Sequence, residues 1–384
     1  MTVAELTERL VAIPSHGDET AAGDAIADWF ETATVDRDTH GNVFARRNPD
    51  GERQLAFVGH HDVVPPAPSQ TTADGAYVVE RREGRLYGRG TADMVGSLAA
   101  AMRAVETADP GALRAADLEL VFVSFVGEED GGVGCRAAVD DGFAPDYAVV
   151  GEGSTGYSAP GVTDVAVAHK GRRGSTLTVD GEAAHASEPE AGVNAVYRAA
   201  DAVGAVRDLD APTATVQGEQ LAGSLAVTGV EGGSAWNVIP ESATITVDER
   251  TVPGERAALD RVAELPGVEW TVDQDLPPMA CDDRGFADVV VDAARAVQDD
   301  VSSADETSDV AGVDPPGDAT PQRVVKPHAT DAGWLAQAGT ACVVCGASEP
   351  GEAHTDTESV SVGVLDRLEA IYTEAIGRVA ASDG

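Results

Sequence analysis

The fold is decided by residues 57–66, which read FVGHHDVVPP. An apolar run from Leu55 to Val58 predicts a buried strand, and polar residues follow it at once. In an open α/β sheet, functional sites form at the carboxyl ends of the strands. Residues two apart on an extended backbone face the same way, so Asp62 is expected to hold one ring nitrogen of His60 while the other binds a metal ion. A polar strand end without chemistry is the alternative, because short motifs often arise by chance.

Two later apolar runs also end in side chains that can carry chemistry. Residues 118–126 lead into Glu128 and Glu129, and residues 147–150 lead into Glu152. Such runs are expected for strands that are buried on both faces. Each acid also has an ordinary explanation, since adjacent acids are usually solvated and Glu152 could cap a helix.

A glycine-rich loop and two late histidines complete the set. The loop, residues 84–94, supplies Asp93 and leads into an alanine-rich helix. It lacks the features of a phosphate-binding loop and of a dinucleotide fingerprint. His354 and His328 come late in the chain, and His328 could be a surface residue. Imidazole nitrogens and carboxylate oxygens suit a pair of zinc-like ions with one shared carboxylate, and their joint position at strand ends favours that interpretation.

Composition indicates a two-domain protein adapted to high salt. At 384 residues the chain is long for one hydrophobic core. It carries 66 acidic and 26 basic residues, a net charge of −40. The acids are scattered rather than concentrated in a tail, and salt would screen their repulsion. No basic stripe exists, so nucleic-acid binding is disfavoured.

The sequence also favours a cytoplasmic location. The N-terminus has neither the basic nor the apolar segment of a signal peptide, and no apolar run approaches the ~18 residues of a membrane span. Cys342 and Cys345 have a C-x-x-C spacing but lie in an apolar run. We expect them to be small buried side chains rather than a metal or redox pair.

The pattern of predicted elements indicates an insertion. Residues 172–277 read as βαββαβ, with the second helix over 254–265, and this order is typical of a split βαβ sandwich. It would be inserted into an α/β domain formed by residues 1–171 and 278–384. Residues 301–322, rich in Asp, Ser, Pro and Gly, are expected to form a flexible surface insertion.

Four segments of the sequence resemble motifs of the dinuclear-zinc amidohydrolases of the M20 metallopeptidase family. They are residues 59–65, 86–94, 127–129 and 149–152. The family includes acetylornithine deacetylase, succinyl-diaminopimelate desuccinylase, aminoacylase and glutamate carboxypeptidase. The resemblance covers nearly the whole chain and implies a mixed-sheet catalytic domain with an inserted α+β lid and dimerisation domain. The chain departs from the family at Val95, where Lys is usual, and at His61, where Thr is common. The insertion at 301–322 has no recognised counterpart, and His61 and His328 are expected to lie outside the metal ligands.

The resemblance assigns roles within the metal site. It implies five metal ligands, which are His60, Asp93, Glu129, Glu152 and His354. Asp93 would bridge the two ions, and its peptide bond to Met94 would be cis. Asp62 would stand behind His60, and Glu128 would be the general acid/base. The ions would be divalent, with zinc as the first choice and cobalt as the alternative.

Other family segments are associated with the substrate. The corresponding residues are His185, Asn237, Arg250 and Thr330. His185 would reach the active site of a neighbouring subunit, which implies a homodimer formed through the inserted domain.

The resemblance implies hydrolysis of the amide bond of an N-acyl amino acid, of the deacetylase or desuccinylase type. A dipeptidase or carboxypeptidase of the same family is the nearest alternative. A relative that only binds an amino-acid derivative is another, but the retained Glu128 argues against it. The sequence leaves open the acyl group, the amino acid and the native metal.

Overall fold

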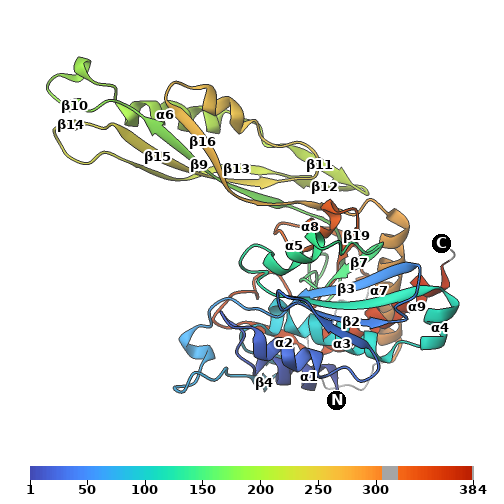
Figure 1. Cartoon of the computed structure of the whole chain (residues 1–384). Helices are drawn as coiled ribbons and strands as arrows, with labels where there is room; N and C mark the ends of the chain where they lie inside the picture. Colours follow the sequence, from blue (N-terminus) through green and yellow to red (C-terminus); the bar gives the residue numbers. More distant parts are fainter. Residues whose placement is uncertain (305–318, 383–384) are drawn as a thin grey trace. The chain divides into compact units, whose positions relative to one another are not determined.

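The computed structural model of the chain describes residues 1–304 and 319–382. The chain divides into two compact units (Figure 1). The first comprises Met1–Ala168, Ala280–Lys326 and Thr330–Gly384, and the second comprises His169–Met279 with Pro327–Ala329. Of the predicted insertion at 301–322, residues 305–318 lie outside the described residues.

The first unit is built on a nine-stranded mixed sheet, with strand order β1-β2-β6-β3-β7-β19-β8-β17 and β18 paired to β8. Its strands are β1 (Thr34–Arg37), β2 (Val43–Arg47), β3 (Arg53–His60), β6 (Leu118–Phe125), β7 (Tyr147–Val150), β8 (Val165–His169), β17 (Met279–Ala280), β18 (Arg323–Lys326) and β19 (Ala341–Val344). β3 runs parallel to both of its neighbours, β6 and β7. All eight residues of β6 are buried, as expected for a central strand that is covered on both faces.

Helices cover this sheet. They are α1 (Val3–Val11), α2 (Thr20–Ala27), α3 (Gly96–Thr107), α4 (Pro110–Ala115), α5 (Val133–Asp140), α7 (Arg284–Ala304), α8 (Ala332–Gln337) and α9 (Val362–Ala381). α3 packs against β3 and β6 and also against α9, which in turn packs against α7. α8 packs against β7, β19 and α5. The mixed sheet with its helices confirms the predicted α/β class. Cys342 in β19 and Cys345 just after it are fully buried and unpaired, as predicted.

A three-stranded sheet and two short helical turns complete the first unit. The sheet has the order β20-β5-β4 and consists of β4 (Glu80–Arg82), β5 (Arg85–Tyr87) and β20 (Ser359–Ser361). The turns are η1 (Pro68–Gln70) and η2 (Thr91–Val95). In this sheet β20, late in the chain, pairs antiparallel with β5. Segments some 270 residues apart in the sequence are thereby joined, for example at the Ser359–Tyr87 pair.

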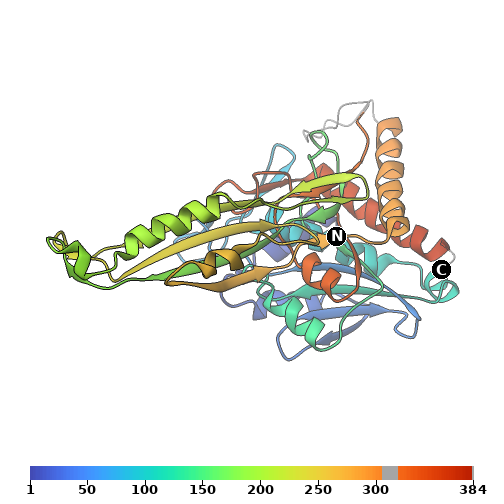
Figure 2. The same cartoon turned by 90° about the horizontal axis from the view of Figure 1, so that it is seen from above.

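The second unit contains a four-stranded antiparallel sheet, in the order β13-β15-β9-β16, with α6 packed against it (Figure 2). Its elements are β9 (Gly171–Asp180), β10 (Ala184–His185), η3 (Pro189–Ala191), α6 (Ala195–Arg207), β11 (Thr213–Val216), β12 (Glu219–Ala222), β13 (Ser224–Gly232), β14 (Val238–Ile239), β15 (Ser242–Thr251), η4 (Leu259–Glu264) and β16 (Val268–Leu276). Leu177, Ala199 and Ile245 are among the fully buried residues of its core.

One sequence prediction for this region is wrong, and one hairpin was missed. The helix predicted over 254–265 is only the short 3-10 helix η4, which begins five residues after Gly254. Gly254 has a φ of +98°, outside the helical region, and Pro266 follows the end of the turn. The β11–β12 hairpin was not predicted. Within residues 1–304 and 319–382, no helix is both long and apolar enough to cross a membrane.

Candidate metal centre

Three adjacent parallel strands bring the candidate ligands together. β3 ends at His60, β6 is followed by Glu128 and Glu129, and β7 is followed by Glu152. These strands are neighbours in the order β6-β3-β7, so their carboxyl ends meet at one edge of the sheet.

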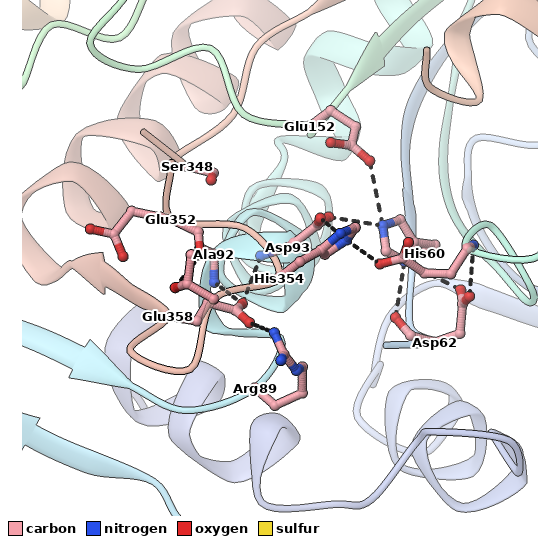
Figure 3. A network of polar contacts seen from close by, with 12 residues as sticks. His60, Asp62, Arg89, Ala92, Asp93, Glu152, Ser348, Glu352, His354 and Glu358 are labelled. Atoms are coloured by element: carbon pink, nitrogen blue, oxygen red, sulfur yellow. Dashed lines mark hydrogen bonds and ion pairs between the residues drawn. The ribbon is translucent and has the colours of Figure 1, made fainter. Parts of the chain in front are cut away.

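The first cluster of ligand atoms consists of His60, Asp93 and Glu152 (Figure 3). Nε2 of His60 lies 3.3 Å from Oδ1 of Asp93 and 3.4 Å from Oε1 of Glu152. A ring nitrogen carries at most one hydrogen and cannot donate it fully to both carboxylates. Three such donor atoms, all within 4.8 Å of one another, fit a cation between them.

The second cluster consists of Asp93, Glu129 and His354, and it shares Asp93 with the first. Nε2 of His354 lies 3.0 Å from Oδ2 of Asp93 and 2.8 Å from Oε1 of Glu129. Asp93 therefore presents one oxygen to each cluster. Among the described residues, these are the two groups with this geometry, and their nitrogen and oxygen donors fit a pair of zinc-like ions.

The carboxylates favour positive charge at both histidines. Hydrogen bonds with Asp93 and Glu129 raise the pKa of His354 to about 10. Burial lowers the pKa of His60, but the hydrogen bonds between its ring and the surrounding carboxylates outweigh burial and raise this pKa well above its ordinary value. Burial alone would raise the pKa of Asp93, and the bonds from His354 and His60 instead hold it well below its usual range. Metal ions would supply this positive charge in place of the protons.

Asp62 supports the first cluster from behind. Nδ1 of His60, the ring nitrogen that faces away from Asp93, lies 3.0 Å from the backbone carbonyl oxygen of Asp62 and 3.2 Å from its Oδ1. The backbone N–H groups of Glu128 and Glu129 donate to Oδ1 and Oδ2 of Asp62 at 3.1 and 3.0 Å. One buried carboxylate thus orients the histidine ring and fixes the turn that carries both acids.

The loop that carries Asp93 has an unusual backbone. The peptide bond between Asp93 and Met94 is cis, as the family resemblance implied. Both residues also depart from helical dihedral angles, with φ/ψ of −123°/94° for Asp93 and −132°/29° for Met94. The side chain of Asp93 therefore leaves the chain at an irregular point just before α3 begins.

Glu128 belongs to neither cluster, yet its environment changes its proton affinity. Burial raises the pKa of Glu128 well above its ordinary value, and the negative charges of Asp331 and Glu152 add to this effect. Asp331 is itself buried, and burial raises its pKa to about 7. A carboxyl group whose pKa is raised and that lies beside candidate metal ligands is suited to general acid/base chemistry.

Lys326 was not predicted from the sequence. Its Nζ lies 3.1 Å from Oε2 of Glu152, the oxygen that does not face His60, and the lysine is buried. Burial raises the pKa of Glu152, but the charge of Lys326 and the hydrogen bond and charge of His60 together outweigh burial and leave this pKa below its ordinary value. The composition could have drawn attention to this residue, because Lys326 is one of only two lysines among 26 basic residues.

His61 and His328 are in neither cluster, as expected. His61 is buried with Nδ1 2.7 Å from Oγ of Ser124, and burial lowers its pKa to about 4. His328 belongs to the segment Pro327–Ala329, which groups with the second unit.

The candidate substrate residues are distributed over both units. In the second unit, His185 is exposed in β10 with Nδ1 2.6 Å from Oγ of Ser187. β10 pairs with β14, which follows Asn237 directly. Arg250, in β15, donates from Nε to Asp248 at 2.8 Å, a contact that does not use its terminal nitrogens. In the first unit, Thr330 is buried next to Asp331 just before α8. Their roles remain predictions.

Comparison with known proteins assigns the family. The sequence pattern of peptidase family M20/M25/M40 matches residues 56–378. The chain is 32% identical to a succinyl-diaminopimelate desuccinylase of Bordetella petrii, over 73% of this chain and 76% of that protein. It is 31% identical to an acetylornithine deacetylase of Proteus mirabilis, over 51% and 52% of the two chains. The fold resembles that of the aminopeptidase PepT of Bacillus cereus, with a TM-score of 0.75, 19% identity and 98% of each chain covered. The chain therefore belongs to peptidase family M20/M25/M40 and is a hydrolase of amide bonds.

Proposed function

We propose that the protein hydrolyses the amide bond of an N-acyl amino acid at a centre of two divalent metal ions. The observation that supports this most is the shared position of Asp93, which has one oxygen 3.3 Å from His60 and the other 3.0 Å from His354. A carboxylate shared by two ligand sets can hold two ions close together, as in a two-metal hydrolytic site.

The donor set favours zinc, with cobalt as an alternative. His60, Asp93 and Glu152 would hold one ion, and Asp93, Glu129 and His354 the other. Ring nitrogens and carboxylate oxygens without sulfur are typical of catalytic zinc sites. Bound ions of this kind would polarise the amide carbonyl and make a water molecule more acidic.

Glu128 would move the proton. Burial raises the pKa of Glu128 and makes it a stronger base, so it would accept a proton from the attacking water. It would then deliver this proton to the nitrogen of the leaving amine. Asp62 would keep His60 and the turn of Glu128 in position throughout.

The nature of the substrate is supported by the relatives. The desuccinylase and the deacetylase that the chain resembles, at 32% and 31% identity, are named for acylated amino acids. This favours a deacylase over the alternative of a dipeptidase or carboxypeptidase. A relative that only binds an amino-acid derivative would have no use for a half-buried carboxyl group, that of Glu128, beside an intact set of ligands.

The second unit would act as the lid and the dimerisation domain, with boundaries near residues 172 and 277. We propose that the protein is a homodimer in which His185 reaches the partner's active site. Arg250 would bind the substrate carboxylate, which its planar guanidinium can hold with two hydrogen bonds. Asn237 and Thr330 would add polar contacts to the substrate. The net charge of −40 supports a cytoplasmic protein adapted to high salt.

The experiment is a substrate screen in high salt. The protein is stripped of metal with a chelator and reloaded with Zn²⁺ or Co²⁺. It is then assayed on N-acetylornithine, N-succinyl-diaminopimelate and simple dipeptides. Release of acetate or succinate that depends on added metal supports the proposal. Hydrolysis of dipeptides alone would replace it with the peptidase alternative, and metal-loaded protein without turnover would favour the binding relative.

A further inference from the structure

A buried ion pair lies behind the metal centre. Nη1 of Arg89 donates to Oε2 of Glu358 at 2.6 Å, and both side chains are almost fully buried, at 3% and 0% exposure (Figure 3). Neither residue belongs to the two ligand clusters. Because removing two charges from water is costly, a pair of this kind is weak evidence for stability by itself and calls for another reason.

The side chain of Glu358 binds the backbone of Asp93, the proposed bridging ligand. Its second oxygen, Oε1, accepts hydrogen bonds from the N–H groups of Ala92 and Asp93 at 3.0 and 3.1 Å. Ala92 and Asp93 stand at the start of η2, where the first backbone N–H groups have no acceptor within the turn. The acceptor that these N–H groups need is therefore supplied by a side chain from another part of the sequence.

The same residue fixes the end of the loop that carries His354. Glu358 follows His354 by four residues and directly precedes β20. Its carbonyl oxygen accepts a hydrogen bond from the backbone of Gly88 at 3.1 Å. Glu358 thus bonds to the loop of Asp93 through its side chain and its carbonyl oxygen, and its own N–H donates to the carbonyl oxygen of Thr355, next to His354, at 3.4 Å. Asp93 and His354 are the two candidate ligands whose donor atoms, Oδ2 and Nε2, lie 3.0 Å apart.

We infer that Glu358 is a positioning residue of the metal centre, with Arg89 as its counter-ion. Glu358 sets the place of Asp93 relative to His354, and Arg89 makes it possible to bury the carboxylate that does so. The inference rests on the proposed function only in taking Asp93 and His354 as metal ligands. The competing explanation is that the pair merely stabilises the fold near β5 and β20.

The test compares the loss of the Glu358 hydrogen-bond acceptor with the loss of its charge. Arg89→Met with Glu358→Gln removes both charges but keeps a side-chain oxygen for the two N–H groups. Arg89→Met with Glu358→Leu removes the charges and the oxygen at similar volume. Zinc affinity is measured on the full chain by competition with a chromophoric chelator. The thermal midpoint of the metal-free protein is recorded beside it.

We expect the Gln variant to keep zinc affinity near that of the wild type. The Leu variant should bind zinc about 10–100-fold more weakly, the usual effect of losing a residue that orients a ligand. Zinc affinity of the folded Leu variant equal to the wild type would overturn the inference. So would an equal loss in both variants, because charge rather than position would then be responsible.

Two further variants keep the test decisive. If the Leu variant does not fold, Arg89→Met with Glu358→Asn withdraws the acceptor by one methylene while keeping its polarity. Weaker zinc binding is then expected, and unchanged binding overturns the inference.

The control is Arg173→Met with Glu249→Leu, which removes a similar buried ion pair with an N–O distance of 2.6 Å. The carboxylate of Glu249 also accepts a hydrogen bond from a backbone N–H, that of Ala257. This variant should lower the thermal midpoint and leave zinc affinity unchanged.

The readout also separates this inference from the proposed function. Protein that binds two ions but hydrolyses no amide would refute the function and leave the positioning role standing. An active enzyme whose Leu variant binds zinc normally would refute the positioning role alone.

Discussion

Replacing Glu128 by Gln should remove the proposed proton-transfer group and change little else. The Glu128 side chain is in neither ligand cluster, and the contact that fixes its turn is made by its backbone N–H with Asp62. The amide cannot accept the proton of the attacking water or return it to the leaving amine. Losing a general acid/base lowers the rate by about 10²–10⁴-fold, or ~3–5 kcal/mol in the activation free energy.

The assay is steady-state hydrolysis of the best substrate from the screen, with the zinc content of each sample measured in parallel. The fall should appear in kcat, with zinc content and thermal midpoint close to those of the wild type. Glu129→Gln, one residue away, is the matched control, because it alters a ligand and should lose zinc instead. Near-normal kcat in Glu128→Gln at full zinc content would refute the assignment of Glu128.

Three other predictions follow from the same geometry. Glu129→Gln should weaken binding of one ion before the other, because it replaces a charged carboxylate oxygen of the second cluster by a neutral amide. Equal loss of both ions in a zinc titration would contradict two separate sites. His354, whose pKa is raised to about 10 without metal, must release its proton when an ion binds. Zinc affinity should therefore rise with pH from 7 towards 10. In the metal-free protein, the protonated ring of His354 should contribute its full stabilisation below the ordinary histidine pKa near 6.5, and this stabilisation should be lost as pH rises through 10. A zinc affinity that does not change between pH 7 and 10 would argue against His354 as a ligand. Mixing His185→Ala with Glu128→Gln subunits should restore activity if His185 acts across a dimer interface, and no recovery after demonstrated subunit exchange would exclude that role.

The core of the candidate site was accessible from the sequence because it follows from strand ends. An apolar run that stops at His60, and others that stop before Glu128 and Glu152, belong to adjacent parallel strands, so local pattern was enough to group them. Asp93 and His354 lie in loops. They entered the candidate set by residue type, and only the family resemblance assigned them as metal ligands, since no periodicity predicts where a loop returns.

The parts that could not be predicted depend on contacts between distant residues. Arg89 and Glu358 are 269 positions apart, and Lys326 is 174 positions from Glu152. No spacing rule connects such pairs, and a charged residue is expected at the surface until a buried partner is known. The helix predicted over 254–265 failed for a local reason instead, because its apolar residues fit a helical period but Gly254 takes a positive φ.

The central claim is that Asp93 bridges two metal ions. Crystals grown with zinc and measured on both sides of the zinc absorption edge would test it directly. Two anomalous peaks about 3.5–4 Å apart are expected in two-metal hydrolytic sites. One peak should contact His60 and the other His354, with an oxygen of Asp93 bound to each. A single peak, or two peaks that do not share Asp93, would contradict the account.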